Sequence, residues 1–352
     1  MNEYETPTGV RRKQGGRVFL LLILLILLLA MLVLAFVAWR IDQIPRVEVD
    51  TNALEQVRIG GSFTNIAIFG LDTRPEDELG SRTDTIMIAS INNWTGNMRL
   101  VSVYRDTVML QQEGFYDKAA HAYAFGYVQG AGMGGQEAMA MLNRNMDLDI
   151  EYFVAVDFYS VAAIIDVIGG VQVELTDEEI HWTNIIAHDT AENIGRVITP
   201  AIEGGAGVHT LDGIYAVSFT RIRHTEGDDF MRAQRQRDVF NQIIGGVTSA
   251  SPMQLWRIQE EVLPNTITNM STEQILWRGV NLIRMNLEEM TGYPFEVTPG
   301  SLPGSDAAYV IPINTTENVR RLHQLLFGND NFIPSSRVQG ISEDISNMTG
   351  IW

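Results

Sequence analysis

The sequence predicts an α/β protein: a single α/β/α sandwich domain with a central mixed sheet, preceded by one N-terminal transmembrane helix. Short apolar runs of strand length alternate with longer segments of helical periodicity, an order typical of α/β folds. Residues 18–39 form an unbroken run without charge, which would span roughly 33 Å as a helix and could cross a bilayer. No internal repeat and no strong break divides the remaining chain, so one domain is expected.

The periodicity also predicts where the individual elements lie. Residues 92–97 have the composition of a hairpin turn between two strands. Strands are expected at 65–70, 85–91, 98–103, 152–156, 171–175, 295–297 and 309–311. Helices are expected at 118–128, 136–144, 158–168, 211–218, 229–244, 252–262, 272–289 and 316–326.

The apolar run at 18–39 is predicted to remain on the protein as an anchor. A cleaved signal peptide has a shorter apolar core, about 7–15 residues, and ends in a small-x-small site, whereas this run ends in Ala38-Trp39-Arg40. Basic residues before the run keep the short N-terminus in the cytoplasm. The predicted location is therefore the cell membrane, single-pass, with an extracytoplasmic main domain. The segments are a cytoplasmic tail (1–17), the transmembrane helix (18–39), a juxtamembrane linker (40–62), the main domain (63–328) and a loose polar tail (329–352).

Composition excludes several classes of protein. The formal net charge is -18, and the N-terminal 40 residues are net basic, so the part outside the membrane is even more acidic. Such a surface repels nucleic acid, and no nucleic-acid partner is expected. The chain has no cysteine, which excludes a disulfide framework and thiol chemistry.

An arginine-rich segment at 220–237 stands out in this acidic chain. Arg221 and Arg223 alternate, so on a strand they would share one face, while Arg232 and Gln236 are four apart and would share one helix face. Arginine matches phosphate oxygens two at a time. The segment alone leaves two interpretations open: an anion-binding site, or a solvated basic face paired with nearby carboxylates.

Carboxylates and cations also follow the predicted strands. Asp72 follows one buried strand and Asp84 precedes the next, so they could share a hard divalent ion, although aspartate is also an ordinary turn residue. Arg105 and Asp106 end another strand and could form a plain ion pair. Lys118 is one of only two lysines in the chain. Either a compact ammonium is needed at this position, or the lysine is there by chance.

Two other patterns are set aside. Residues 130–135 fit G-x-G-x-x-G, but that motif needs a preceding strand, and here a predicted helix precedes it. The segment is interpreted as a turn between helices. His181 and His188 are seven apart in what reads as a polar loop, and no third metal ligand is evident.

Taken together, these motifs resemble the LytR-CpsA-Psr family of bacterial cell-envelope proteins, from about Asn65 to Asn241. The similar segments, in the family's order, are 65–74, 81–85, 102–107, 117–118, 166–171, 211–213 and 221–236. Residues 102–107 are similar to the family's Ser-Ile-Pro-Arg-Asp-Thr signature, with Tyr104 where proline is usual. The short N-terminal tail and single anchoring helix are also the family's layout.

The resemblance implies a phosphotransferase that moves a glycopolymer from a polyprenyl-pyrophosphate carrier to peptidoglycan. It implies Mg²⁺ (or Mn²⁺) on Asp72 and Asp84, with those two residues and Asp106 as candidates for a general base. Catalytic roles would fall to Arg82, Arg105 and Asp106. Contacts to the pyrophosphate would come from Arg82, Arg105, Lys118, Arg221, Arg223, Arg232 and Gln236.

Two alternative functions remain at this point. The same site would serve a hydrolase of the lipid-linked pyrophosphate, with water as the acceptor. The chain could also be a membrane-anchored regulatory or binding protein of the envelope, although its anchor and acidic outer part argue against DNA contact. The sequence does not identify the glycopolymer or the acceptor.

Overall fold

The computed structural model describes residues 35–72, 82–130, 132–223, 228–275 and 286–352. The chain divides into two compact units, Met1–Gln43 and Ile44–Trp352. The predicted cytoplasmic tail and most of the predicted transmembrane helix lie outside the described residues, as do Thr73, Arg74, Ser81 and part of the helix predicted at 272–289. Within the described ranges, no helix has the length and apolar character needed to cross a membrane.

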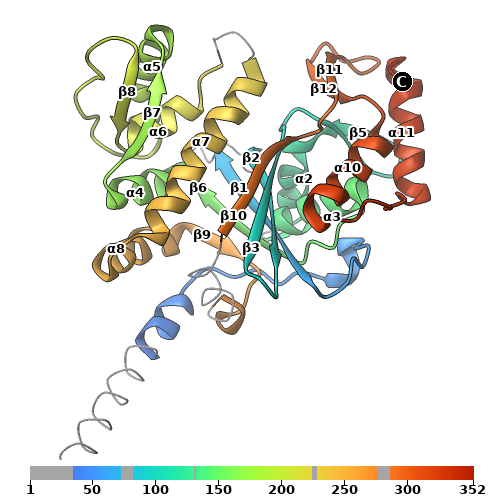
Figure 1. Ribbon diagram of the computed structural model, residues 1–352, viewed down its shortest axis with the longest axis horizontal. Coiled ribbons are helices and arrows are strands. Elements are labelled where there is room, and N and C mark those ends of the chain that lie inside the picture. The colour runs from blue at the N-terminus through green and yellow to red at the C-terminus, as the bar shows by residue number, and fades with distance from the viewer. Residues whose placement is uncertain (1–34, 73–81, 131, 224–227, 276–285) are drawn as a thin grey trace, which may run out of the picture. The chain divides into compact units, whose positions relative to one another are not determined.

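A six-stranded mixed sheet forms the centre of the larger unit (Figure 1). Strands β1, β2 and β3 pair antiparallel, whereas β6 runs parallel to β1, β10 runs parallel to β3, and β9 is antiparallel to β6. The prediction of a mixed α/β fold with a central mixed sheet is therefore confirmed. In spatial order the strands are β10 (Asn286–Tyr293), β3 (Asn97–Val103), β2 (Arg82–Asn92), β1 (Phe63–Asp72), β6 (Tyr152–Asp157) and β9 (Thr266–Thr268).

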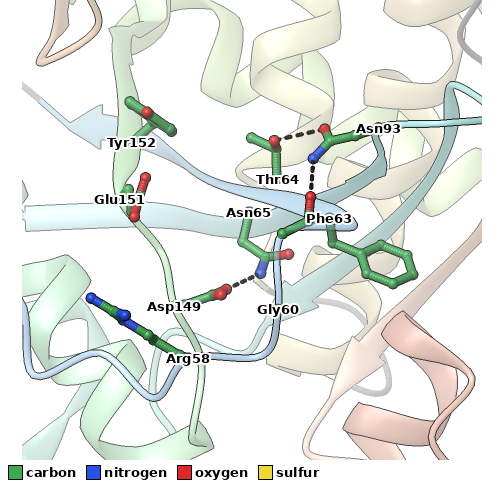
Figure 2. Close-up of a pocket in the computed structure, with 10 residues that line it drawn as sticks. Arg58, Gly60, Phe63, Thr64, Asn65, Asn93, Asp149, Glu151 and Tyr152 are labelled. Carbon is green, nitrogen blue, oxygen red and sulfur yellow. Dashed lines mark hydrogen bonds between the residues drawn. The ribbon is translucent and has the colours of Figure 1, made fainter.

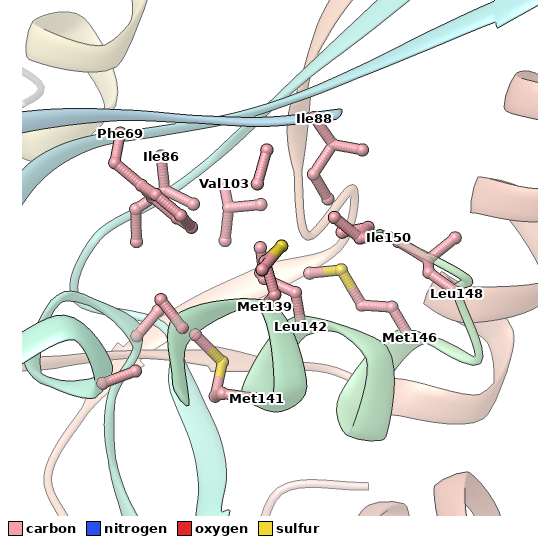
Figure 3. Packing of buried hydrophobic residues seen from close by; sticks show 14 of the residues in the cluster. Phe69, Ile86, Ile88, Val103, Met139, Met141, Leu142, Met146, Leu148 and Ile150 are labelled. Atoms are coloured by element: carbon pink, nitrogen blue, oxygen red, sulfur yellow. The ribbon is translucent and has the colours of Figure 1, made fainter. Parts of the chain in front are cut away.

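Helices cover both faces of this sheet (Figure 1). Ile86 and Ile88 of β2 join the core formed with α2 (Ala122–Gln129) and α3 (Met133–Met146), as Figure 3 shows. The intervening Met87 and Ala89 face the other side, where they pack with α7 (Asp228–Thr248). Because side chains alternate along a strand, a near-continuous apolar run is buried on both faces.

A second core lies beside the sheet around a two-stranded ribbon (Figure 1). The ribbon consists of β7 (Val171–Leu175) and β8 (Gly207–Leu211). Four helices belong to this part of the chain: α4 (Phe158–Ile168), α5 (Asp177–Asn193), α6 (Gly213–Thr220) and α8 (Pro252–Val262).

The C-terminal part contributes a third core. The hairpin of β11 (Val297–Gly300) and β12 (Tyr309–Pro312) packs near that of β4 (Val108–Gln112) and β5 (Phe115–Lys118). Helices α10 (Thr315–Phe327) and α11 (Ser336–Thr349) follow. Short 3-10 helices occur at Thr51–Leu54, Ala119–His121 and Leu263–Asn265.

The prediction of a loose tail at 329–352 is wrong, because α11 buries Val338, Ile341 and Ile345. These three residues are spaced by three and four positions, which is the pattern of a helix. The polar residues around them made the segment resemble a loose tail. The polar loop predicted around His181 and His188 is also wrong. It is helix α5, which begins with a capping box between Thr176 and Glu179.

Three element boundaries also differ from the prediction. The helix expected at 211–218 begins only at Gly213, because Asp212 caps it and Leu211 ends β8. Lys118 ends strand β5 instead of starting a helix. Residues 286–289 were expected to be helical, but they begin strand β10. This strand forms by parallel pairing with β3, a contact between distant segments that local periodicity does not predict.

Gly130 and Gly132 lie between α2 and α3, as predicted, whereas Met133, Gly134 and Gly135 already form the first turn of α3. A side chain at Gly135 would overlap the ring of Phe153, and one at Gly134 would overlap Tyr123. These glycines therefore permit close packing of α3 against the sheet and α2.

Candidate functional site

The candidate site lies where β1 ends and β2 begins. Asp72 is the last residue of β1 and pairs in register with Arg82, the exposed first residue of β2. One step along β1, from Gly70 to Leu71, corresponds to two steps along β2, from Thr85 to Thr83, so Asp84 is the extra residue of a β-bulge. Bulges re-aim side chains and are frequent beside active sites. The irregular pairing thus gives Asp84 a position that a regular ladder would not.

The turn after β3 brings two cations to this bulge. The Arg105 guanidinium hydrogen-bonds the Asp84 carboxylate, and its Nε lies 3.6 Å from Asp106 Oδ2. Lys118 Nζ lies 2.8 Å from Asp106 Oδ1. Asp106 therefore links Arg105 to Lys118, and both carboxylates are buried.

The backbone of this turn is held from two sides. The Ala120 N–H donates to the Arg105 carbonyl at 2.9 Å, and the Val310 N–H donates to the Asp106 carbonyl at 2.9 Å. Tyr104, at the position where the family usually has proline, donates its N–H to the Tyr293 carbonyl at 2.9 Å. Proline has no such donor. The Tyr104 ring also packs edge-on against Phe230 of α7, with centroids 4.9 Å apart.

The arginine-rich segment reaches the same bulge from the other direction. Arg223 NH2 lies 3.4 Å from Asp84 Oδ2, and Gln236 Nε2 donates to the Asp84 carbonyl at 3.4 Å. Arg232 lies one turn before Gln236 on α7 and is buried. The predicted helix that carries Arg232 and Gln236 is confirmed.

Arg221 is directed away from this group. Arg221 and Arg223 would share one face only on a strand, and that condition is not met, because Arg221 is the C-terminal cap of α6. Its guanidinium contacts Asp189 at 2.7 Å and the Thr190 hydroxyl at 2.8 Å, and it lies over the Phe158 ring. These contacts fix α6 to α5, and a cation at a helix C-terminus is favourable.

Six predicted residues therefore form one connected group, and cations outnumber carboxylates in it. Phosphate oxygens fit such a group because guanidinium forks can bind them in pairs. The group consists of Asp84, Arg105, Asp106, Lys118, Arg223 and Gln236, with Asp72 and Arg82 at the adjoining strand ends.

A pocket of about 390 Å³ lies at the opposite end of β1 (Figure 2). Its polar groups bond to one another: Asn65 donates to Asp149 at 2.5 Å, and Thr64 bonds to Asn93 at 2.8 Å. The charge pattern that predicts anion binding is at the carboxyl end of β1. We therefore place the site there and not at this pocket.

Three residues near the site were not singled out from the sequence. Asp117, His121 and Tyr309 form a hydrogen-bonded group next to Lys118. The spacing of four between Asp117 and His121 was a usable signal. Tyr309 comes from a distant strand, and no local pattern marks it.

The comparison with protein families matches residues 45–322 to the LytR_cpsA_psr family. The chain belongs to this family. The similarity predicted from the ordered motifs is thus confirmed, and it extends well beyond Asn241.

Named relatives agree with this assignment. The polyisoprenyl-teichoic acid–peptidoglycan teichoic acid transferase TagU of Bacillus mycoides is 29% identical over 230 residues, which cover 64% of this chain and 67% of that protein. A structure of TagT bound to LI-WTA superposes with a TM-score of 0.55 at 20% identity, covering 87% of this chain and 100% of the other. TagT with bound octaprenyl pyrophosphate lipid gives a TM-score of 0.52 at 19% identity, with the same coverage. At these identities the two solved structures establish a shared fold.

Proposed function

We propose that this protein is a phosphotransferase that moves a glycopolymer from a polyprenyl-pyrophosphate carrier to peptidoglycan. The observation that carries this proposal is the convergence on Asp84 of side chains from three separate segments: Arg105, Arg223 and Gln236. The TagU relative is a teichoic acid transferase by name, and TagT has been solved with octaprenyl pyrophosphate. Both support a lipid-linked pyrophosphate as the substrate.

In the proposed reaction an acceptor hydroxyl of a wall sugar attacks the phosphorus nearest the glycan. The bond from that phosphorus to the bridging oxygen breaks, and polyprenyl phosphate leaves with the electron pair. Phosphoryl transfer depends mainly on positioning and on stabilising charge over the transferred group. Arg105 and Arg223, with Arg82 at the adjoining strand end, supply that charge. Asp106 holds Arg105 and Lys118 in place.

The acceptor proton needs a destination as well. Asp84 contacts Arg105 and Arg223, and Asp106 contacts Arg105 and Lys118. Asp72, Asp84 and Asp106 are the candidates for a general base. A loose transition state makes strong base catalysis less essential.

Asp72 and Asp84 would hold Mg²⁺ (or Mn²⁺). Among the described residues, no group of three or more His, Cys, Asp or Glu side chains is placed to hold a metal ion. Mg²⁺ is often bound by one or two carboxylates, with water and substrate phosphate as the other ligands, so the pair fits. When bound, the ion would neutralise charge on the pyrophosphate. Phosphate oxygens would then replace Asp84 as partners of Arg105 and Arg223.

We further infer that residues 18–39 anchor the protein in the cell membrane, with the N-terminus in the cytoplasm and the main domain outside. The support is the length of the apolar run and the basic residues before it. N-terminal sequencing of the mature protein should begin near Met1, and external protease should cleave the main domain in intact cells. A mature N-terminus near Arg40 would contradict the anchor.

Product analysis tests the proposed reaction. The full-length protein in detergent is mixed with a lipid-linked glycan, purified peptidoglycan and Mg²⁺. Glycan covalently attached to peptidoglycan is the expected product. Free glycan phosphate in its place would identify a hydrolase, and no turnover of the lipid would favour a binding or regulatory protein.

A further inference from the structure

Lys118 is held on two sides next to the site. Its Nζ lies 2.8 Å from Asp106 Oδ1 and 5.2 Å from the centroid of the Tyr309 ring. A lysine side chain has four flexible carbons and loses considerable conformational entropy when its ammonium is fixed. An ammonium that must meet a phosphate oxygen therefore benefits from neighbours that fix it beforehand.

Asp117 lies at the centre of those neighbours. Its carboxylate accepts hydrogen bonds from the Lys118 backbone N–H at 2.8 Å, from His121 Nδ1 at 2.8 Å and from the Tyr309 hydroxyl at 3.2 Å. A charged carboxylate only accepts, so the imidazole and the phenol are the donors. The bonds come from β5, the following 3-10 helix and the distant strand β12.

The charge state of Asp117 suits this role. Burial alone would raise the pKa of its carboxyl, but the hydrogen bonds from His121 and from the Lys118 N–H outweigh burial and lower the pKa below its usual value. Asp117 is therefore a carboxylate at neutral pH and can accept all three bonds.

Tyr309 contacts both Asp117 and Lys118, each with a different part of its side chain. Its hydroxyl bonds to Asp117, and its ring lies beneath the Lys118 ammonium, where the negative face of the ring attracts a cation. A residue that only filled the core would need neither contact. The hydroxyl fixes the ring, and the ring together with Asp106 fixes the ammonium.

We propose that Asp117, His121 and Tyr309 form a positioning network that holds the Lys118 ammonium toward the substrate pyrophosphate. This inference rests on the proposed function, since it assigns Lys118 to the phosphate site. It adds three positioning residues, one of them from the C-terminal hairpin that the motif analysis did not reach.

The first test follows Lys118 without any substrate. The chain has only two lysines, Lys13 and Lys118, so isotope-labelled lysine gives two side-chain NMR signals. Tyr309→Phe should move the Lys118 signal and narrow it as the ammonium gains motion. Tyr116→Phe is the matched control, because the Tyr116 hydroxyl bonds to Asp344 at 2.8 Å, which is also a tyrosine–aspartate hydrogen bond.

The second test measures binding of geranylgeranyl pyrophosphate to the full-length protein in detergent by calorimetry. Lys118→Met should weaken binding about 10- to 100-fold, as for loss of a charged hydrogen bond. Tyr309→Phe should weaken binding about 2- to 10-fold, the size of one neutral hydrogen bond. In the Lys118→Met background, Tyr309→Phe should have no further effect, because its effect passes through the lysine.

Two results would overturn the network. One is a Lys118 NMR signal that Tyr309→Phe leaves unchanged, or that Tyr116→Phe changes as much. The other is an equal loss of binding from Tyr309→Phe with and without Lys118. If the wild type does not bind the pyrophosphate lipid at all, the proposed function fails instead, and the NMR result still decides the network.

Discussion

The two ends of strand β1 are both polar, yet they differ in what their side chains bond to. At the carboxyl end, charged groups from distant segments meet at Asp84, and cations exceed carboxylates. At the amino end, Asn65 bonds to Asp149 and Thr64 to Asn93, around a pocket of about 390 Å³ (Figure 2). These two side-chain pairs at the amino end tie loops to the sheet.

This difference is the reason for placing the site by its charged groups and not at the pocket. Like charges brought close together cost free energy unless a ligand or a counter-charge compensates them. At the carboxyl end of β1, Arg105 and Arg223 both contact the carboxylate of Asp84. Two like charges are therefore close together at this end of the strand. Such a concentration of cations predicts an anionic ligand, whereas a self-bonded polar pocket does not.

The largest effect is expected from removing the shared carboxylate. Asp84→Ala should reduce glycan transfer below detection, because both the proposed Mg²⁺ ligand and the partner of Arg105 and Arg223 are lost. Asp149→Ala removes a carboxylate at the amino end and is the control, expected to keep transfer. The transfer assay with and without chelator provides the measurement, and a melting curve reports the fold. If Asp84→Ala transferred glycan at the wild-type rate, the site would not lie at the carboxyl end of β1.

A smaller but still large effect is expected from the arginines of the site. Arg223→Ala should lower transfer on the order of 10²-fold, as for other losses of transition-state charge stabilisation. Its side chain is 45% exposed, so stability should change by only about 0–1 kcal/mol. Arg223→Lys should rescue poorly, because lysine cannot form the bidentate contact.

Arg235 provides the contrast to Arg223. It is buried and pairs with Glu179 at 2.9 Å, so Arg235→Ala leaves a buried carboxylate without its partner. Stability should fall by roughly 3–5 kcal/mol. Denaturant unfolding and the transfer assay, run on both variants, separate the two roles. An Arg223→Ala protein that unfolds easily but transfers normally would make Arg223 structural.

A moderate effect on stability, without a direct effect on the site, is expected from acid. Burial lowers the pKa of His323, whose Nε2 donates to the Met146 carbonyl at 2.9 Å. The neutral ring is thus favoured in the folded state, and its contribution to stability is complete above about pH 6.5. As pH falls through that value toward the lower folded pKa, the contribution is lost. Melting temperatures from pH 7.5 to 5 should fall less steeply for His323→Phe than for the wild type.

The smallest effect is expected at the amino-end pocket. Glu151→Gln and Arg58→Ala change exposed side chains that line it. Transfer should change less than about twofold, and stability by less than about 0.5 kcal/mol. A loss of transfer comparable to that of Arg223→Ala would mean that this pocket takes part in the reaction.

Much of the site was predictable because its residues follow strand ends. Asp72, Asp84 and Arg105 each lie next to a predicted strand, whereas Lys118 was noticed as one of only two lysines. In the structure Arg105 contacts Asp84, and Asp106 joins Arg105 to Lys118. Arg221 lies apart from this group in the structure, because it caps the C-terminus of α6 and contacts Asp189. The spacing of two residues between Arg221 and Arg223 does not report such a cap.

The fold, like the site, was predictable where nearby residues determine the structure, and it was not predictable where distant segments pair. Residues 158–168 were predicted as a helix with the observed bounds, since an aspartate cap and a glycine end mark it. The bulge at Asp84 and the parallel strand β10 depend on pairing between distant segments.

Electron density for geranylgeranyl pyrophosphate and Mg²⁺ in crystals of the protein would test the central claim most directly. Our account predicts the pyrophosphate at the carboxyl end of β1, with Arg105 and Arg223 on its oxygens and the ion on Asp72 and Asp84. Density for the pyrophosphate in the pocket beside Asn65 and Asp149, with the arginines still bound to Asp84, would contradict it.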